Sequence, residues 1–396
     1  METADVVVIG AGANGTSTAF HLAKAGVKDV VVVEKNHLGA GATGKSGALV
    51  RMHYTNEHET RLAVESFKYF TNWSDMVGGD CGLNQIGLFV FTPPEHYADL
   101  EANVAMQKEV GAETYLLTAE DAAEIDPSVS FHDVTHVAYE PNSGYADPNA
   151  TTYSFARAAM DMGVRFKLDT PVTRILTEGD RVTGVETPDG VIQTSNVVVC
   201  AGAWANKLFQ PIGVDLPLEP KYARVSVFRW SFDRPEKHMT YIDRINGTWS
   251  RPTDGHSTLI GAETGVRPSD DPDHYQEAPN QDYVNHCRQQ LINRFPVMRH
   301  STMRGTWAGI LMRSVDSRPV IGSVDQYEGL YCMTGDSGTS FKTSPAIGKC
   351  LSELITTGAS STVDLTPFRP SRFAEGKPWV DVHTYGSTDD EDTISR

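Results

Sequence analysis

The stretch Asp5-Val-Val-Val-Ile-Gly10-Ala-Gly12-Ala-Asn-Gly15 is the most informative part of this 396-residue chain for predicting its fold. A short β-branched run leads into closely spaced glycines, and residues 16–25 have helix-forming composition. A second run, Asp29-Val-Val-Val-Val-Glu34, ends on an acidic residue 19 positions after the last glycine. This order of strand, turn, helix and strand predicts a βαβ unit that binds a dinucleotide.

Each part of this pattern has a physical task. Gly10 allows a tight turn, Gly12 lets the backbone approach a pyrophosphate, and Gly15 lets helix and strand pack closely. The helix N-terminus supplies unpaired N–H groups and a positive dipole. Glu34 can accept hydrogen bonds from ribose hydroxyls and would repel a 2′-phosphate. The adjoining residues expected at the same site are Ala13, Asn14 and Lys35.

A second glycine segment, Gly39-Ala-Gly-Ala-Thr-Gly44-Lys45-Ser46, matches the phosphate-loop pattern GxxxxGK[ST] of nucleoside triphosphatases. Its surroundings argue against that function. A phosphate loop springs directly from a strand and enters a helix, whereas here four residues follow the strand that ends at Glu34, and residues 47–54 have extended character. A phosphate-loop NTPase using Lys45 and Ser46 is therefore kept only as an alternative.

Composition excludes several classes of protein. The chain carries 34 Lys and Arg against 51 Asp and Glu, a net charge of −17, which disfavours binding to nucleic acid or an anionic membrane. Five widely spaced cysteines form no CxxC pair, and no run of about 18 apolar residues occurs. Thirteen scattered histidines form no metal-binding spacing, so no metal site is predicted. We expect a soluble cytoplasmic protein without a membrane span.

Several later segments, together with the first motif, give the chain a resemblance to the D-amino-acid oxidase and sarcosine oxidase superfamily of FAD-dependent oxidoreductases. Their order along the chain carries this resemblance up to about Pro367. The segments are Gly39 to Gly47, Asp147-Pro148 before a helix, Val197-Val-Val-Cys-Ala-Gly-Ala-Trp204, Trp307-Ala-Gly309, Asp316-Ser-Arg-Pro-Val-Ile-Gly322 and Gly335-Asp-Ser-Gly338-Thr-Ser-Phe-Lys342-Thr-Ser-Pro345-Ala-Ile-Gly348.

The resemblance implies an α/β (α+β) fold, in which a Rossmann-like FAD-binding domain of the glutathione-reductase type carries an inserted antiparallel-sheet substrate domain. A polar helical stretch at 94–110 and strand-like alternation at 222–262, with hairpin signals at Asn246-Gly247 and Asp254-Gly255, fit the insertion. We expect the FAD-binding domain at residues 1–85, 140–215 and 305–370, the substrate-binding domain at 86–139 and 216–304, and a disordered acidic tail at 386–396.

The resemblance also implies which residues contact FAD. Beyond the first motif, the adenosine end is expected near Val172, and the flavin ring near the second and last glycine segments. Gly309 stands where sarcosine oxidases have the cysteine that tethers the flavin, so FAD is expected to bind without a covalent bond. The further cofactor-binding residues implied are Gly41, Thr43, Gly44, Lys45, Ser46, Gly47, Ala48, Ala201, Gly202, Trp204, Gly338, Thr339, Ser340, Phe341 and Lys342.

Two cations match the family positions that hold a substrate carboxylate, Arg51 and Lys342. An amino-acid anion entering a buried pocket needs such compensation, and Arg can bind a carboxylate through two parallel hydrogen bonds. Tyr54, Trp249 and Arg251 are expected in the pocket wall, with sheet packing as the alternative. Leu259 stands where these oxidases have a lysine credited with promoting the reaction with oxygen, which leaves oxygen or an electron carrier as acceptor.

The expected function is therefore FAD-dependent oxidation of the C–N bond of a small secondary or N-methyl amino acid of the sarcosine, proline or glycine type. The resemblance implies hydride transfer to flavin N5 and a homo- or hetero-oligomer. One alternative is an FAD-dependent 2-hydroxy-acid dehydrogenase. Alternatives from other classes are the NTPase above and an electron-relay subunit of a hetero-oligomer, whose flavin would not bleach with small amines.

Overall fold

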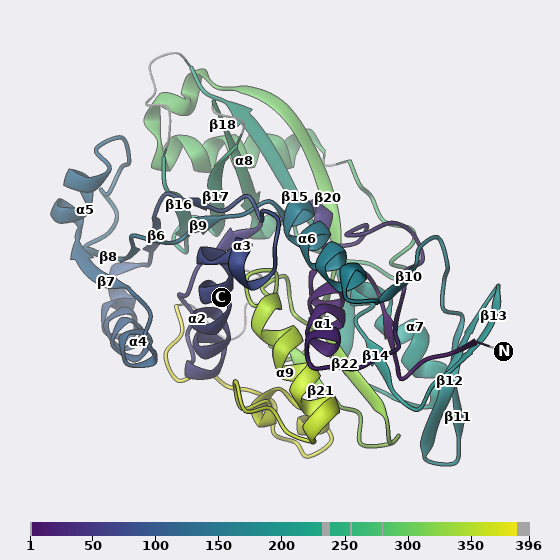
Figure 1. The fold of residues 1–396 in the computed structure, drawn as a ribbon. Coiled ribbons are helices and arrows are strands. Elements are labelled where there is room, and N and C mark those ends of the chain that lie inside the picture. The colour runs from purple at the N-terminus through teal and green to yellow at the C-terminus, as the bar shows by residue number, and fades with distance from the viewer. Residues whose placement is uncertain (1, 232–237, 254–255, 279, 386–396) are drawn as a thin grey trace.

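The computed structural model describes residues 2–231, 238–253, 256–278 and 280–385. The acidic tail predicted at 386–396 and the turn signal at Asp254-Gly255 lie outside these residues. Within them, the chain forms two large sheets and two small ones, and helices pack around them, as Figure 1 shows. This is the mixed α/β fold that the sequence predicts; the boundaries between the two domains stay a prediction.

A six-stranded sheet holds the first motif. Its strands come from distant parts of the chain and run parallel, apart from one antiparallel edge strand. The valine runs at 6–9 and 30–33 are buried on both faces, which explains their continuous apolar sequence. In spatial order the strands are β10 (Arg165–Lys167), β3 (Val30–Val33), β2 (Val6–Ile9), β14 (Val197–Val199), β22 (Leu330–Thr334) and β21 (Val320–Ser323).

Three helices cover one face of this sheet: α1 (Ala13–Lys24), α6 (Pro148–Asp161) and α9 (Ser344–Thr357). They lie side by side in Figure 1. A Cβ atom at Gly348 would lie 2.3 Å from the Ser17 side-chain oxygen, so this glycine sets the close approach of α9 to α1. The first helix begins three residues earlier than its composition suggested, because the glycine turn runs directly into the first helical turn.

The opposite face packs against a four-stranded sheet made of β1 (Glu2–Thr3), β13 (Gly190–Gln193), β12 (Arg181–Thr187) and β11 (Arg174–Glu178). Alternate side chains of β2 enter the two cores: Val6 and Val8 face the helices, whereas Val7 and Ile9 face this small sheet. The six-stranded sheet is therefore the middle layer between the three helices and the small sheet. The ends of its strands lie at the borders of the two cores.

A nine-stranded sheet forms the other large layer. Most neighbours are antiparallel, as predicted, but β16 and β6 pair in parallel because they come from two separate segments of the chain. The Asn246-Gly247 turn joins β16 to β17, and Gly247 has φ +58°. The strands in order are β19 (Arg267–Pro268), β15 (Leu218–Arg229), β18 (Ser257–Ala262), β17 (Thr248–Thr253), β16 (Thr240–Asp243), β6 (Leu88–Phe91), β8 (His136–Glu140) and β7 (Tyr115–Thr118), and β20 (Thr302–Ser314) pairs with β15.

A three-stranded sheet of β4 (Leu49–Val50), β9 (Gly144–Tyr145) and β5 (Asn84–Gln85) joins the two large layers. Only β4 is regular strand within residues 47–54, so most of that stretch is irregular. The remaining α-helices of the described chain are α2 (Glu57–Thr71), α3 (Trp73–Met76), α4 (Tyr97–Val110), α5 (Ala119–Ile125), α7 (Ala205–Phe209) and α8 (Gln281–Arg294). Among the described residues, no helix has the length and apolarity needed to span a membrane.

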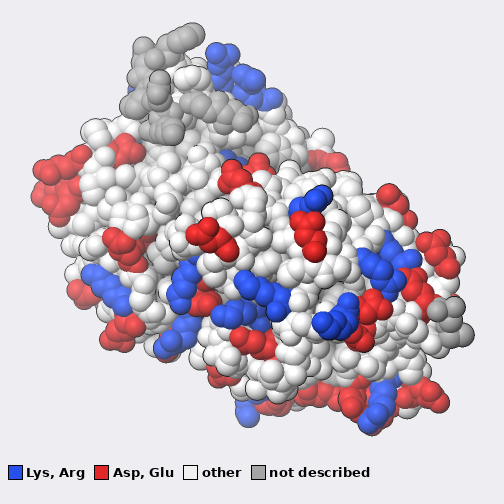
Figure 2. Space-filling model, in the orientation of Figure 1, with Lys and Arg blue, Asp and Glu red and all other residues white. Residues whose placement is uncertain are grey.

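Acidic and basic side chains alternate over the face drawn in Figure 2, with no large basic patch on it. This agrees with the net charge of −17. A face of this kind offers no clustered cations to a polyanionic partner.

Candidate active site

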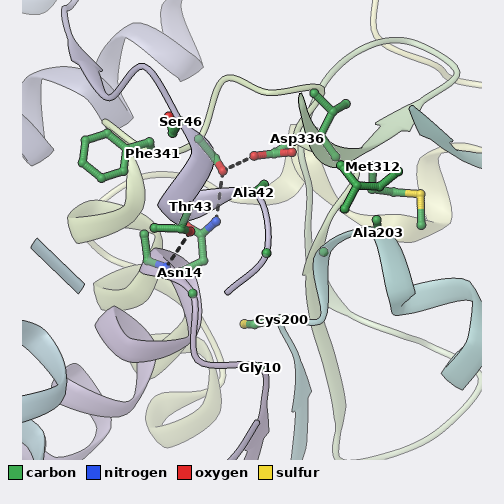
Figure 3. A pocket seen from close by; sticks show the side chains of 18 of the residues that line it. Gly10, Asn14, Ala42, Thr43, Ser46, Cys200, Ala203, Met312, Asp336 and Phe341 are labelled. Carbon is green, nitrogen blue, oxygen red and sulfur yellow. Dashed lines mark hydrogen bonds between the residues drawn. The ribbon is translucent and has the colours of Figure 1, made fainter. Parts of the chain in front are cut away.

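A cavity of about 450 Å³ lies between the two large sheets. Its walls come from the turn between β2 and α1, from residues 40–51, from residues 200–204, from the middle of β20, and from the loop before α9. Figure 3 shows Gly10, Asn14, Thr43, Cys200, Met312 and Phe341 arranged around this space. The cavity therefore begins where parallel strands end, the usual ligand position in such sheets.

The first glycine turn has the geometry that a diphosphate requires. Gly10 has φ +104°, and a Cβ atom there would lie 2.4 Å from the carbonyl oxygen of Cys200. Gly12 precedes α1 and has no side chain to cap this helix end; Ala13 N–H donates to the Thr43 hydroxyl, which leaves the next N–H groups of the first turn for a ligand. The Asn14 side-chain oxygen is buried and has no partner among the described residues, an orphaned acceptor on the cavity wall. These features fit a bound dinucleotide.

The acidic residue at the end of β3 is held in place by the backbone. The Glu34 carboxylate accepts hydrogen bonds from the Ala11 and Asn36 N–H groups, each at 2.9 Å, and lines the cavity. Its position beside the glycine turn is where a ribose would lie if the diphosphate sat at the start of α1.

The second glycine segment supports the first turn and does not have the shape of a phosphate loop. Residues 43–45 form one 3₁₀ turn, and the strand β4 follows, where a phosphate loop would enter an α-helix. The Thr43 hydroxyl oxygen accepts a hydrogen bond from Ala13 N–H at 3.1 Å. Lys45 donates to Tyr275 and Glu277 instead of pointing toward a loop of backbone N–H groups. The NTPase alternative therefore has no structural support.

The last glycine segment closes the cavity from the side of α9. Asn14 donates a hydrogen bond to the Ser340 hydroxyl at 3.0 Å, and that hydroxyl donates to Asp336 (Figure 3). Gly335 and Gly338 have φ +62° and +81°, and Gly338 lies on the cavity wall. The hydrogen bond between Asn14 and Ser340 links two segments that lie more than 300 residues apart in the sequence.

Most residues predicted for the cofactor line this one cavity. Gly15 and Gly44 do not: a Cβ at Gly15 would lie 2.0 Å from Gly10 O, and one at Gly44 would lie 2.7 Å from Gly39 O, so both serve close backbone packing. The predicted residues on the cavity wall are Gly10, Gly12, Ala13, Asn14, Glu34, Lys35, Gly41, Thr43, Lys45, Ser46, Gly47, Ala48, Val172, Ala201, Gly202, Trp204, Gly309, Gly338, Thr339, Ser340, Phe341 and Lys342.

The two predicted carboxylate-binding cations both lie on the cavity wall, beside the same aromatic ring. Arg51 and Lys342 are 4% and 7% exposed, and both line the wall. Both lie beside the fully buried Tyr54 ring, whose centroid is 4.6 Å from the Arg51 guanidinium carbon and 5.2 Å from Lys342 Nζ; Tyr54 itself, predicted for the pocket wall, does not line the cavity. Burial, and after it the positive charge of Arg51, hold the pKa of Lys342 well below its usual range. An anion entering beside these groups would restore the charged form of Lys342.

Trp249 and Arg251, on β17, have different positions. The Trp249 ring packs against Gly47, where a Cβ would lie 2.2 Å from it, and it also lines the cavity. Arg251 donates to the carbonyl oxygen of Gly47 at 2.6 Å and lies outside the cavity wall. Arg251 therefore contacts the glycine segment, and its geometry matches the packing alternative.

Sequence patterns did not indicate two buried residues, Glu140 and Tyr385, that contact the segment next to Arg51. The Glu140 carboxylate accepts from Met52 N–H at 3.0 Å and from the Ser143 hydroxyl. Burial raises the pKa of Glu140, against the opposite influence of Arg51 and Lys342. His53 Nε2 lies 2.8 Å from the Tyr385 hydroxyl, and Arg51 donates to the His53 carbonyl oxygen. These contacts bring the end of the described chain against residues 51–53.

The described part of the chain has no group of side chains suited to holding a metal ion. No three His, Cys, Asp or Glu side chains are placed to hold a metal ion there. His53, the histidine nearest the cations in sequence, is buried, and burial followed by the charges of Arg51 and Arg244 lowers its pKa well below the usual value. A neutral histidine beside Arg51 adds no charge to the site.

The fold and this cavity are those of a dinucleotide-binding oxidoreductase. The family model described as FAD dependent oxidoreductase matches residues 5–354, and the chain belongs to that family. It is an FAD-dependent oxidoreductase, as the sequence predicts, and the glycine turns and orphaned acceptor described above fit FAD.

Three relatives illustrate the similarity. Sarcosine oxidase subunit beta of Rhodobacter capsulatus is 25% identical over 382 residues, covering 94% of this chain and 89% of that protein. The corresponding subunit from Arthrobacter sp. is 27% identical, with coverages of 96% and 93%. The crystal structure of L-proline dehydrogenase from P. horikoshii is 27% identical in sequence and has a TM-score of 0.88. The match covers 96% of this chain and 100% of that chain.

Longer relatives are matched only in part. The mitochondrial dimethylglycine dehydrogenase of Rattus norvegicus is 31% identical over 220 residues, which is 55% of this chain but 26% of that protein. The Mus musculus protein of the same name is covered over 44% of its length. The chain thus spans less than half of these dehydrogenases.

Proposed function

We propose that this protein oxidises the C–N bond of a small secondary or N-methyl amino acid. The observation that carries the proposal is the placement of two buried cations, Arg51 and Lys342, beside one aromatic ring on the wall of the cavity whose glycine turns fit FAD. Relatives named for sarcosine, proline and dimethylglycine support the same substrate class.

The protein's own task in this reaction is to bind and orient. The guanidinium of Arg51 and the ammonium of Lys342 would hold the substrate carboxylate, and the Tyr54 ring, which contacts both cations, would help to keep them in place. Holding the carboxylate in this way would fix where the amine-bearing carbon of the substrate lies. When bound, FAD would supply the acceptor for the electron pair of the C–H bond on the amine-bearing carbon, whose bond to nitrogen becomes a double bond. Positioning of this kind supplies much of an enzyme's rate.

Protonation of Lys342 would accompany substrate binding. Its pKa is lowered by burial and by Arg51, and a bound carboxylate would raise it again. The amine of the substrate must lose a proton before its C–H electrons can leave. Neutral Lys342 could take up a proton as the zwitterion binds, which would leave the ammonium form beside the carboxylate.

The electron acceptor and partners belong to the same proposal. Leu259, at the position where an oxygen-activating lysine is expected in the oxidases, is buried in β18 opposite Arg251. An apolar side chain there favours an electron carrier over oxygen. Two relatives are named as subunits, which supports a hetero-oligomer in which this chain holds the amine-oxidising site.

Anaerobic mixing of the FAD-loaded protein with a panel of amino acids, N-methyl amino acids and 2-hydroxy acids tests the proposal. Loss of flavin absorbance with an N-methyl or secondary amino acid is the expected result, and subsequent admission of air would show whether oxygen is the acceptor. Bleaching by hydroxy acids alone would identify a hydroxy-acid dehydrogenase. No bleaching with any of them would indicate an electron-relay subunit.

A further inference from the structure

Residues 269–277, between β19 and α8, cross the mouth of the cofactor cavity; we name them the strap. One side of the strap is fixed to β15 of the nine-stranded sheet. Ser269 N–H donates to the Pro220 carbonyl oxygen at 2.9 Å, and the Tyr275 ring stacks on Tyr222 with 6.0 Å between centroids. Arg224 donates to Gln276 at 3.1 Å. The strap is thus anchored on the substrate side of the cavity.

The other side of the strap is bound to residues of the cofactor wall. The Asp273 carboxylate pairs with Lys35 at 2.6 Å and with Lys207 at 2.6 Å, and it accepts from the Trp204 indole N–H at 2.7 Å. Asp271 pairs with Lys207 at 2.7 Å. Lys35, Trp204, Lys207 and Asp273 all line the cavity. The strap therefore bridges the two walls between which a dinucleotide would lie.

A third lysine joins the strap farther along. Lys45 donates to the Tyr275 hydroxyl at 2.7 Å and pairs with Glu277 at 2.9 Å. The carboxylates of Asp271, Asp273 and Glu277 therefore balance the three lysines at the cavity mouth. All these ion pairs are partly exposed, with side-chain exposures of 29–67%. Each one is weak and open to screening by salt, but they act together on one segment.

We propose that the strap retains FAD, so that the bound cofactor leaves only after the ion pairs to Lys35, Lys45 and Lys207 have opened. A different arrangement of the same residues makes the opposite prediction. If the three lysines instead bound the FAD phosphates directly, the strap carboxylates would compete with the cofactor, and removing them would slow its release. The two arrangements predict opposite signs for one measurement.

The pairs stay charged over the range in which proteins are usually handled. Burial acts to raise the pKa of Asp273, but hydrogen bonds from Lys207, Lys35 and Trp204 outweigh it and lower that pKa to about 2. Lys207 and His274 likewise lower the pKa of Asp271. Salt, and not mild acid, is therefore the variable that opens the strap.

The double variant Asp271→Asn/Asp273→Asn tests the strap. FAD-loaded protein is diluted, and the rise of free-FAD fluorescence gives the release rate at about 0.05 M and about 0.5 M salt. We expect release at low salt roughly 3- to 10-fold faster than in the unaltered protein, and a weaker dependence on salt. Asp270→Asn is the matched control, because Asp270 is exposed, carries the same charge and makes none of these contacts.

Release at the unaltered rate, or slower release, would overturn the proposal. Asp271→Asn alone provides a second route to the same test, since it breaks the pair to Lys207 from the strap side, leaves the lysines of the cavity wall unchanged and removes one charge, as Asp270→Asn does. If the double variant does not load FAD, this single variant decides. The readout is cofactor release and needs no substrate, so its outcome is independent of the proposed amine oxidation.

Discussion

Tyr54 and Lys342 donate hydrogen bonds to the same acceptor, the carbonyl oxygen of Thr339, each at 2.9 Å. These contacts tie the loop before α9 to the irregular segment that carries Arg51. Tyr54 is fully buried, and burial raises its pKa, so its hydroxyl remains a donor. The shared carbonyl therefore holds Lys342 beside Tyr54, whose ring also contacts Arg51, before any substrate arrives.

Removing either cation should weaken substrate binding. We expect Arg51→Ala and Lys342→Ala each to raise the concentration of amino acid needed for half-maximal flavin bleaching by roughly 10²-fold, the loss of a buried charge partner. Anaerobic titration followed by absorbance measures this. Arg251→Ala serves as the control, because Arg251 lies outside the cavity wall. Unchanged half-saturation in both cation variants would refute the carboxylate clamp.

Binding of a carboxylate should weaken as the pH rises. The folded protein lowers the pKa of Lys342, so the ammonium form that attracts an anion is lost below the usual titration range of lysine. A titration with propionate, which has no amine of its own, followed by the shift in the flavin spectrum at several pH values, measures this. Lys342→Met should show weak binding without that pH dependence. An equal pH dependence in both proteins would show that Lys342 does not cause it.

The first turn should tolerate no side chain. Gly10→Ala would place a Cβ 2.4 Å from the Cys200 carbonyl at a positive φ, and we expect FAD retention to be lost. Gly26→Ala is the matched control: Gly26 also has a positive φ, +92°, but a Cβ there would meet no atom within 4 Å. Absorbance of the purified variants at flavin wavelengths gives the result. Equal FAD content in both would contradict the close approach at Gly10.

The first βαβ unit could be predicted from the sequence because its determinants are local. Valine runs, three glycines and an acidic strand end specify strand, turn and helix within about thirty residues. The phosphate-loop pattern at Gly39–Ser46 misleads for a related reason: its few letters describe a turn rich in glycine, whereas the function depends on the strand before it and the helix after it.

Residues whose placement depends on long-range packing could not be predicted. Glu140 ends an ordinary strand, and Tyr385 lies in a segment without any motif, yet both contact residues 51–53. Asp273 belongs to an acidic loop that has the composition of a solvated turn, and only the assembled fold brings it to Lys35. Such contacts join residues more than 80 positions apart, which no local pattern encodes.

A buried histidine away from the cavity should make the fold sensitive to acid. Burial, followed by the charge of Lys24, lowers the pKa of His21 to about 3, whereas in an unfolded chain the imidazole titrates near its ordinary pKa of 6.5. Between these values the unfolded state binds more protons, so stability falls as the pH falls. The free energy of unfolding should drop by about 2 kcal/mol from this group between about pH 7 and about pH 5.

Urea unfolding at the two pH values, compared between the unaltered protein and His21→Leu, measures this contribution. In the variant, the part of the change in unfolding free energy that comes from His21 should be absent, because leucine fills similar space without titrating. His300→Leu, at an exposed histidine, provides the control. The same pH response in His21→Leu and in the unaltered protein would show that His21 does not titrate as described.

The most direct test of the central claim compares substrates that differ only in the carboxylate. The FAD-loaded protein is mixed without oxygen with sarcosine and dimethylamine, and then with proline and pyrrolidine, while flavin absorbance is followed. The account predicts bleaching by at least one of the two amino acids, at a concentration roughly 10²-fold below that of its partner amine. Equal bleaching by amine and amino acid, or a flavin that neither amino acid reduces, would contradict it.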